Sequence, residues 1–135
     1  MERFLPNGLD VRTVSPLTLA YLGDGVYELL MRESMVNGGN CRPKDLHRVT
    51  AGRVCAKAQA AAVKRIQDQL TEEEQAVLKR GRNAHTSRVL KNTSSEEYHL
   101  ATGLEALFGY LYLTGQMERI LSLFAEILKG EPEET

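Results

Sequence analysis

Residues 100–113 read LATGLEALFGYLYL, the most apolar helical segment of this 135-residue chain. Leucines and aromatic residues recur there at intervals of three and four, a spacing that predicts an α-helix. Its one charged residue is Glu105. A carboxylate among apolar side chains is costly to bury unless it is paired or bound to a cation. We therefore expect Glu105 either to pair with an arginine or to act as a ligand.

The rest of the chain also shows helical spacing, while the period-two alternation of strands never lasts. Segments 71–74 (TEEE) and 94–97 (SSEE) are capping boxes, and glycines follow two of the expected helices. The sequence therefore predicts an all-α domain of about five to seven helices. The expected helices run from 15–16 to about 35, from 42–43 to 66, from 71 to 81–83, from 94 to at least 111, and from 117 to 129.

Length and composition fit one globular domain over residues 1–135, with residues 131–135 as a frayed tail. Hydrophobic residues make up 42% and charged residues 26%, which excludes disordered, collagenous and membrane-spanning classes. The start of the chain lacks the apolar segment of a signal peptide. Cys41 and Cys55 are then expected to be reduced thiols of a cytoplasmic protein. Together with His47 they lack the paired spacing of zinc ligands.

Charge is distributed unevenly along the chain, although the net charge is only −1. Residues 1–40 carry a net charge of −2, residues 41–92 a net charge of +7, and residues 93–135 a net charge of −6. A basic middle between acidic flanks favours a polyanionic partner. The alternative is that helix surfaces in this region happen to carry lysine and arginine.

The basic middle contains one segment without any acidic residue, KRGRNAHTSRVLKN at 79–92. Arginine, amide and hydroxyl groups bind phosphates and 2′-hydroxyls, and the absence of Tyr and Phe favours a duplex over stacked single-stranded bases. We expect nucleic-acid contacts from Lys79, Arg80, Arg82, Asn83, His85, Arg88 and Lys91. A second strip at helical spacing consists of Lys44, His47, Arg48 and Arg53, for which an exposed helix face is the alternative.

The segment LAYLGDGVY at 19–27 places an acidic residue between two glycines inside a predicted helix. Glycines cost stability in a helix interior, so either two helices cross closely there with Asp24 facing solvent, or the carboxylate itself is needed. If this helix packs on the helix that carries Glu105, the two carboxylates converge on one hard cation, for which Mg²⁺ is expected. Glu28 would contribute only through water.

These two acidic segments resemble the signature segments of the ribonuclease III family. LAYLGDGVY resembles the pattern L-E-x-L-G-D-x-V, and residues 101–113 (ATGLEALFGYLYL) resemble A-D-x-x-E-A-L-x-G-x-x-Y-L. Residues 76–84 (AVLKRGRNA), and a chain that ends soon after the second segment, resemble the Mini-III subfamily, which lacks a double-stranded-RNA-binding domain. The resemblance covers nearly the whole chain.

The resemblance implies catalytic and metal-binding roles for Asp24 and Glu105, with Mg²⁺ as cofactor and Mn²⁺ as a substitute. The family pattern has carboxylates where this chain has Ala20 and Thr102. It also implies a homodimer that cleaves double-stranded RNA to 5′-phosphate and 3′-hydroxyl ends. For the subfamily the implied substrate is precursor large-subunit (23S) ribosomal RNA, with a large-subunit ribosomal protein assisting.

Phe108, Tyr110 and Tyr112 of the apolar helix offer more apolar surface than one small core needs, which favours a dimer. The family resemblance adds that the first helix, near Tyr21 and Tyr27, helps to form its two-fold interface. Two other functions compete with the nuclease. A non-catalytic RNA-binding or ribosome-assembly protein would account for Ala20 and Thr102. A helical DNA-binding regulator would account for the charge pattern but leaves both carboxylates unexplained.

Overall fold

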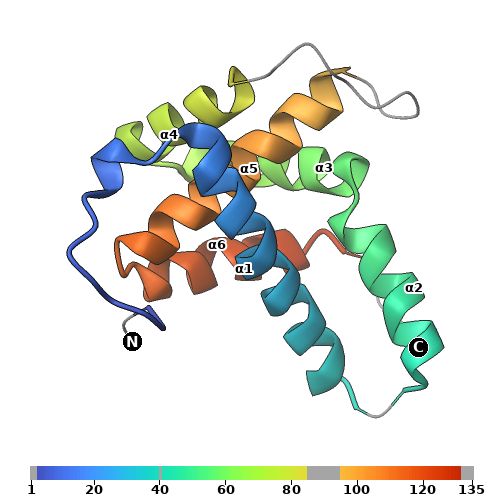
Figure 1. Ribbon diagram of the computed structural model, residues 1–135. Helices are drawn as coiled ribbons and strands as arrows, with labels where there is room; N and C mark the ends of the chain where they lie inside the picture. Colours follow the sequence, from blue (N-terminus) through green and yellow to red (C-terminus); the bar gives the residue numbers. More distant parts are fainter. Residues whose placement is uncertain (1–2, 40, 85–94, 132–135) are drawn as a thin grey trace.

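The computed structural model describes residues 3–39, 41–84 and 95–131. Over those ranges the chain forms six α-helices and two short 3-10 helices and contains no strand, so the all-α prediction is confirmed (Figure 1). In chain order these are η1 (Val11–Thr13), α1 (Pro16–Asn37), α2 (Pro43–Val54), α3 (Ala56–Ile66), η2 (Gln67–Gln69), α4 (Glu72–Arg82), α5 (Ser95–Leu113) and α6 (Met117–Leu128). No helix in these ranges is long and apolar enough to cross a membrane.

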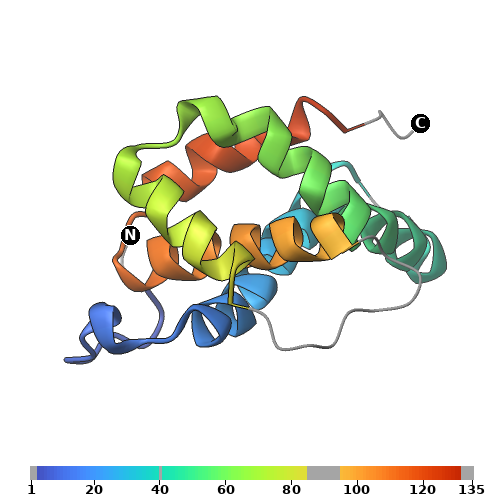
Figure 2. The ribbon, with the colours of Figure 1, turned by 90° about the horizontal axis from the view of Figure 1, so that it is seen from above.

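Helix α5 is the centre of the domain, because it is apolar on every side and must be covered all round. It contacts α1, α3, α4 and α6, and Figure 2 shows α1 on one side of it and α3 and α4 on the other. Leu104, Leu107 and Phe108 are completely buried. The Tyr27 ring of α1 meets Phe108 edge to face, with 5.3 Å between ring centroids.

Helices α1 and α5 cross at a pair of glycines. A Cβ added to Gly23 would overlap the carbonyl oxygen of Glu105 and lie 2.7 Å from the backbone nitrogen of Gly109. A Cβ added to Gly109 would overlap the carbonyl oxygen of Leu19 in turn. The expected close crossing is therefore present at Gly23, whereas Gly25 faces open space.

A second glycine pair fixes α4 against α5 on a side next to the one that α1 covers. A Cβ on Gly81 would come within 2.7 Å of the Ala106 Cβ, and one on Gly103 within 2.7 Å of the Leu78 carbonyl oxygen. Because these positions lie on either side of Glu105 in sequence, the two crossings together fix its backbone. The end of α4 is held close to the same part of α5.

The capping box that the sequence predicts at the start of α4 is present in the structure. The Thr71 hydroxyl accepts from the Glu74 backbone at 3.1 Å, and the Glu74 carboxylate accepts from the Thr71 backbone at 2.9 Å. The capping box at 94–97 includes Ser94, which lies outside the described residues.

The prediction of one helix from 42–43 to 66 is wrong. Cys55 adopts an extended backbone with φ −69° and ψ 161°, which separates α2 from α3. The break lets α2 pack against α1 while α3 turns to pack against α5. Two helices with different partners replace one straight helix that could not reach both.

The frayed tail also needs correction at its first residue. The Glu131 carboxylate lies 3.7 Å from the Arg53 guanidinium, and both side chains are largely buried. This ion pair ties residue 131 to the end of α2. Residues 132–135 lie outside the described part of the chain.

The aromatic residues expected at a dimer surface are for the most part in the core instead. Tyr27 and Phe108 are fully buried, and Tyr112 is 9% exposed. Tyr110 is half-buried and its hydroxyl donates to Glu73. Tyr21 is the exception, with 84% of its surface exposed.

Candidate functional site

The structure brings Asp24 and Glu105 together. Asp24 lies on α1 immediately after Gly23, and Glu105 lies on α5 opposite it, so the glycine crossing sets the separation of the two side chains. Asp24 is exposed and Glu105 is half-buried. The two carboxyl groups lie close enough for Asp24 to raise the pKa of Glu105. The pair is therefore open to solvent on the Asp24 side and enclosed on the Glu105 side.

The electrostatics of the pair follow from this geometry. Burial, as the largest cause, and the neighbouring Asp24 carboxyl together raise the pKa of Glu105 to about 8. Near neutral pH the raised pKa favours the protonated form of Glu105. A divalent cation would favour both ionised carboxylates and would displace that proton.

Within the described residues no arginine or lysine pairs with Glu105, so the expectation of an arginine partner is not met. The same residues contain no group of three or more acidic, histidine or cysteine side chains that could hold a metal. Glu28 lies 3.5 Å from Arg32 in an ion pair. The protein's own donors at this site are thus the two carboxyl groups.

The two positions that depart from the family pattern are both buried. Ala20 is 6% exposed and packs with Leu19, Val77 and Ala106 in a small apolar cluster. Thr102 is 7% exposed, and its hydroxyl donates to the Tyr98 carbonyl oxygen at 3.1 Å. Neither position adds a ligand to the pair.

Sequence reasoning missed one side chain at this site, Gln59 of α3. It is 1% exposed, and its amide lies close enough to Glu105 to lower the pKa of that carboxyl. Its Nε2 forms no hydrogen bond with any described residue. Gln59, Val63 and Ile66 follow helical spacing on one face of α3. A lone polar residue on an otherwise apolar face was the available signal.

The basic residues of α4 are exposed at its carboxyl-terminal end. Lys79, Arg80, Arg82 and Asn83 all face solvent, and the packing of Gly81 on α5 holds this end of the helix. Positive side chains there also suit the negative end of the helix dipole. His85, Arg88 and Lys91 lie outside the described residues.

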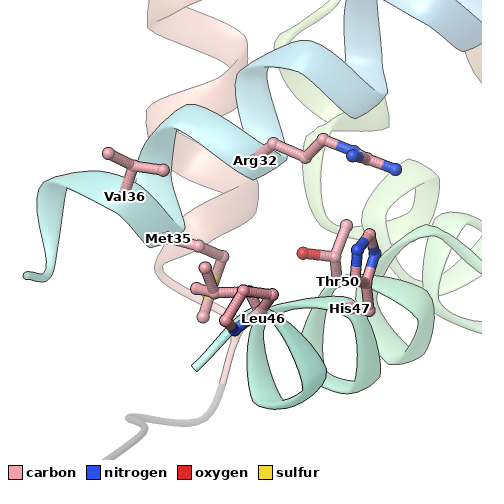
Figure 3. Close-up of a pocket in the computed structure, with 7 residues that line it drawn as sticks. Arg32, Met35, Val36, Leu46, His47 and Thr50 are labelled. Carbon is pink, nitrogen blue, oxygen red and sulfur yellow. The ribbon is translucent and has the colours of Figure 1, made fainter. Parts of the chain in front are cut away.

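The second basic strip is only partly formed. Lys44, His47 and Arg48 are exposed on α2, but Arg53 is drawn away by its ion pair with Glu131 and does not belong to the strip. Figure 3 shows a small hollow between α1 and α2, into which both helices direct side chains. Its volume is about 170 Å³, and its lining consists of Arg32, Met35, Val36, Pro43, Leu46, His47 and Thr50.

A broader apolar groove lies between α1, α6 and the segment before η1. Its volume is about 510 Å³. Three large apolar side chains at this groove are well exposed, with Phe4 at 68%, Leu29 at 53% and Leu121 at 57%. These side chains make the groove an apolar surface that faces solvent.

Comparison with known proteins gives consistent matches. The ribonuclease III domain matches residues 17–116, a span that includes both Asp24 and Glu105. The Mini-ribonuclease 3 of Symbiobacterium thermophilum is 50% identical over 108 residues, which are 80% of this chain and 83% of that protein. The Mini-ribonuclease 3 of Enterococcus faecalis is 42% identical over 129 residues, 93% of this chain and 98% of that protein.

A solved structure agrees with these sequence relatives. The crystal structure of protein FN1578 from Fusobacterium nucleatum superposes with a TM-score of 0.80 at 33% sequence identity. The match covers 92% of this chain and 100% of that one. The helical arrangement of Figure 1 is therefore shared over nearly the full length of both proteins.

Proposed function

Since the chain belongs to the ribonuclease III family, within its Mini-ribonuclease 3 subfamily, and is an endoribonuclease, we propose that it cuts double-stranded RNA at the Asp24–Glu105 pair with one bound Mg²⁺. The observation that carries this proposal is the close approach of the two carboxyl groups at the Gly23–Gly109 crossing. Family membership argues against a DNA-binding regulator and against a non-catalytic binding protein.

The donor set fits a hard divalent cation. Mg²⁺ is commonly held by one or two carboxylates and keeps its other positions for water and substrate phosphates. Asp24 and Glu105 repel each other when both are ionised, and a double positive charge between them removes that repulsion. Mn²⁺ takes the same oxygen ligands and should substitute.

The residues have separate tasks in the proposed reaction. When bound, the cation supplies charge that stabilises the phosphodiester in its transition state and lowers the pKa of an attacking water. Asp24, exposed to solvent, would hold the cation on the side where RNA arrives. Glu105, half-buried between two helix crossings, would fix its position. The products would carry 5′-phosphate and 3′-hydroxyl ends.

We assign duplex binding to the end of α4 and the segment that follows. Lys79, Arg80, Arg82 and Asn83 are exposed there, and the sequence 79–92 contains no Tyr, Phe or Trp for base stacking. His85, Arg88 and Lys91 extend the assignment along the chain. Phosphate and 2′-hydroxyl contacts from such groups read the shape of a duplex.

A homodimer completes the proposal, because one carboxylate pair per protomer would cut one strand each. The apolar groove around Leu29 and Leu121, with the exposed Tyr21 on the same helix α1, supports this interface. We further propose precursor 23S ribosomal RNA as the substrate, a large-subunit ribosomal protein as helper, and residues 1–135 as one catalytic domain. The subfamily resemblance supports this part.

Single-turnover cleavage of a labelled RNA duplex with Mg²⁺ tests the catalytic assignment. Asp24→Asn keeps the side-chain volume but removes the charge that holds the cation, so the rate should fall at least about 100-fold. Binding of the duplex should change little, because the basic residues remain. Asp68→Asn, the same substitution at an exposed position of η2, is the matched control. A rate for Asp24→Asn equal to that of the control would refute the assignment.

A further inference from the structure

Most of the positive charge in the middle of the chain lies outside the end of α4. Residues 41–66, which include α2 and α3, contain seven lysines and arginines and one acidic residue, a net charge of +6. Residues 67–92 contain five lysines and arginines and four acidic residues, a net charge of +1. Protein surfaces ordinarily carry both signs of charge interspersed. Duplex binding at the end of α4 therefore leaves the larger part of this positive charge without a role.

Two of these cations, Lys44 and Arg48, lie one turn apart on the exposed face of α2. In the described part of the chain neither of them forms an ion pair with a carboxylate. The one acidic residue of this helix, Asp45, is already paired with Arg42 at 3.1 Å. Gly52 continues the row of Lys44 and Arg48, and a Cβ there would meet open space. The exposed face of α2 is thus open to close approach and carries positive charge that no carboxylate neutralises among the residues described.

Helix α1 adds a further cation beside this face. Figure 3 shows the Arg32 guanidinium and the His47 ring at the same end of the hollow between α1 and α2. Arg32 pairs with Glu28 at 3.5 Å, and both side chains are exposed. A guanidinium has five N–H donors, so Arg32 can bind Glu28 and a second acceptor together. The α1–α2 surface is defined by Arg32, Lys44, His47 and Arg48.

The α1–α2 surface and α4 lie on opposite sides of the carboxylate pair along α1. Helix α4 reaches α1 before Asp24, where Val77 packs with Ala20. Helix α2 reaches α1 after Asp24, at Arg32 and the residues that follow it. Asp24 and Arg32 are eight residues apart, so about 12 Å of helix separates them. A ligand that crosses the carboxylate pair along α1 therefore passes basic side chains at both ends.

We propose that the α1–α2 surface binds phosphates of the same RNA duplex that contacts the end of α4, so that the duplex is held on both sides of the carboxylate pair. This inference rests on the proposed function. Residues 41–66 contain no Tyr, Phe or Trp, so the surface suits the backbone of a duplex and not the stacked bases of a single strand. Phosphate contacts fix the orientation of a protein on a duplex. Two separated contacts align the duplex across Asp24, whereas one contact leaves it free to turn.

The test is binding of a labelled RNA duplex to the full chain, measured by fluorescence anisotropy over a range of salt concentrations with a chelator present to prevent cleavage. Lys44→Ala combined with Arg48→Ala removes two exposed charges, and alanine preserves the helix. The Kd of this variant should rise about tenfold, and the slope of log affinity against log salt should fall by about 2. Lys44→Arg combined with Arg48→Lys keeps both charges and should keep the slope.

Lys64→Ala combined with Lys129→Ala is the matched control. It removes the same charge from two exposed positions, one on α3 and one at the end of α6, neither of which lies on α1 or α2. Its salt slope should stay close to that of the wild-type chain. If the control lowers the slope as much as the α2 variant does, overall charge attracts the RNA and the inference is overturned. An unchanged slope in the α2 variant overturns it as well, and assigns the surface to another partner such as an acidic protein.

Arg80→Ala combined with Arg82→Ala separates failure of this inference from failure of the proposed function. If this α4 variant lowers the salt slope and the α2 variant does not, the contact at α4 stands and the role of the α1–α2 surface is wrong. If the wild-type chain does not bind the duplex, both are wrong. A slope that falls by about 2 in each variant and by about 4 when all four substitutions are combined supports both contacts on one duplex. A combined variant whose slope falls no further than that of either pair overturns the two-sided arrangement.

Discussion

Glu105→Gln should make the cation-free protein more stable, and the gain should grow with pH. The pKa of Glu105 is about 8 in the folded chain and 4.5 for an ordinary glutamate. Because folding raises this pKa, the carboxyl contributes most stability below pH 4.5, and that contribution is lost as pH rises toward 8. Glutamine mimics the protonated side chain at every pH, so the Glu105→Gln variant keeps this stability as the pH rises.

The size of the effect follows from the same two values. Linkage gives a difference of about 1 kcal/mol at pH 5, about 3 kcal/mol at pH 7 and about 5 kcal/mol above pH 8. Glu105 is only half-buried, and screening by solvent reduces the gain at pH 7 to about 2 kcal/mol. Each such change is large against the total stability of a domain of this size.

Urea unfolding at pH 5, 7 and 8.5 in the presence of a chelator measures this difference. Glu72→Gln, at an exposed position of α4, removes the same charge without burial and should show no growing gain. Mg²⁺ should then stabilise the wild-type chain but not Glu105→Gln, by about 2.7 kcal/mol at one hundred times its Kd. A gain for Glu105→Gln that is the same at pH 5 and 8.5, or a loss at both, would refute the electrostatic account of the pair.

Three further outcomes test the crossing, the basic segment and the apolar groove. Gly109→Ala should lower the free energy of unfolding by about 3 kcal/mol in urea melts, because there is no room for its Cβ. Gly25→Ala, whose Cβ meets open space, should leave the free energy of unfolding equal or up to about 1 kcal/mol higher. Equal effects of the two substitutions would contradict the close crossing at Gly109. Replacing Arg80 and Arg82 together with alanine should lower the salt slope of duplex binding by about 2, and an unchanged slope would remove them from the RNA contact. If the proposed dimer forms through the apolar groove, Leu29→Asp should be a monomer in analytical ultracentrifugation under conditions in which the wild-type chain is a dimer. A dimer that persists in the variant places the interface elsewhere.

Local signals were sufficient to predict most of the helices. The Thr71–Glu74 capping box marks the start of α4, and Pro16 marks the start of α1, because caps and first-turn residues act within one helical turn. The break at Cys55 carries no such signal. It exists because α2 and α3 must pack against different helices, and that requirement appears only when the chain is assembled.

The aromatic residues show a second limit of sequence reasoning. An apolar helix has no polar face to show which side is covered by its own chain and which side by another. Phe108 and Tyr27 therefore resemble interface residues in the sequence, yet they fill the core. The side chains that are exposed in the folded chain, and so open to a partner, are Leu29 and Tyr21 instead.

The location of the carboxylate pair follows from the same helix that stabilises the domain. Helix α5 can be covered closely on two sides because Gly103 and Gly109 leave room for neighbouring backbones, and Glu105 lies between them. Close packing around Glu105 raises the free-energy cost of ionising its carboxyl group. Near neutral pH the protein without a cation is therefore less stable than a variant with an uncharged side chain at this position. The same enclosure strengthens the attraction between the ionised pair and a divalent cation, because less water surrounds Glu105 to screen it. The position that costs stability without a cation is therefore the position at which the proposed cation would be bound most firmly.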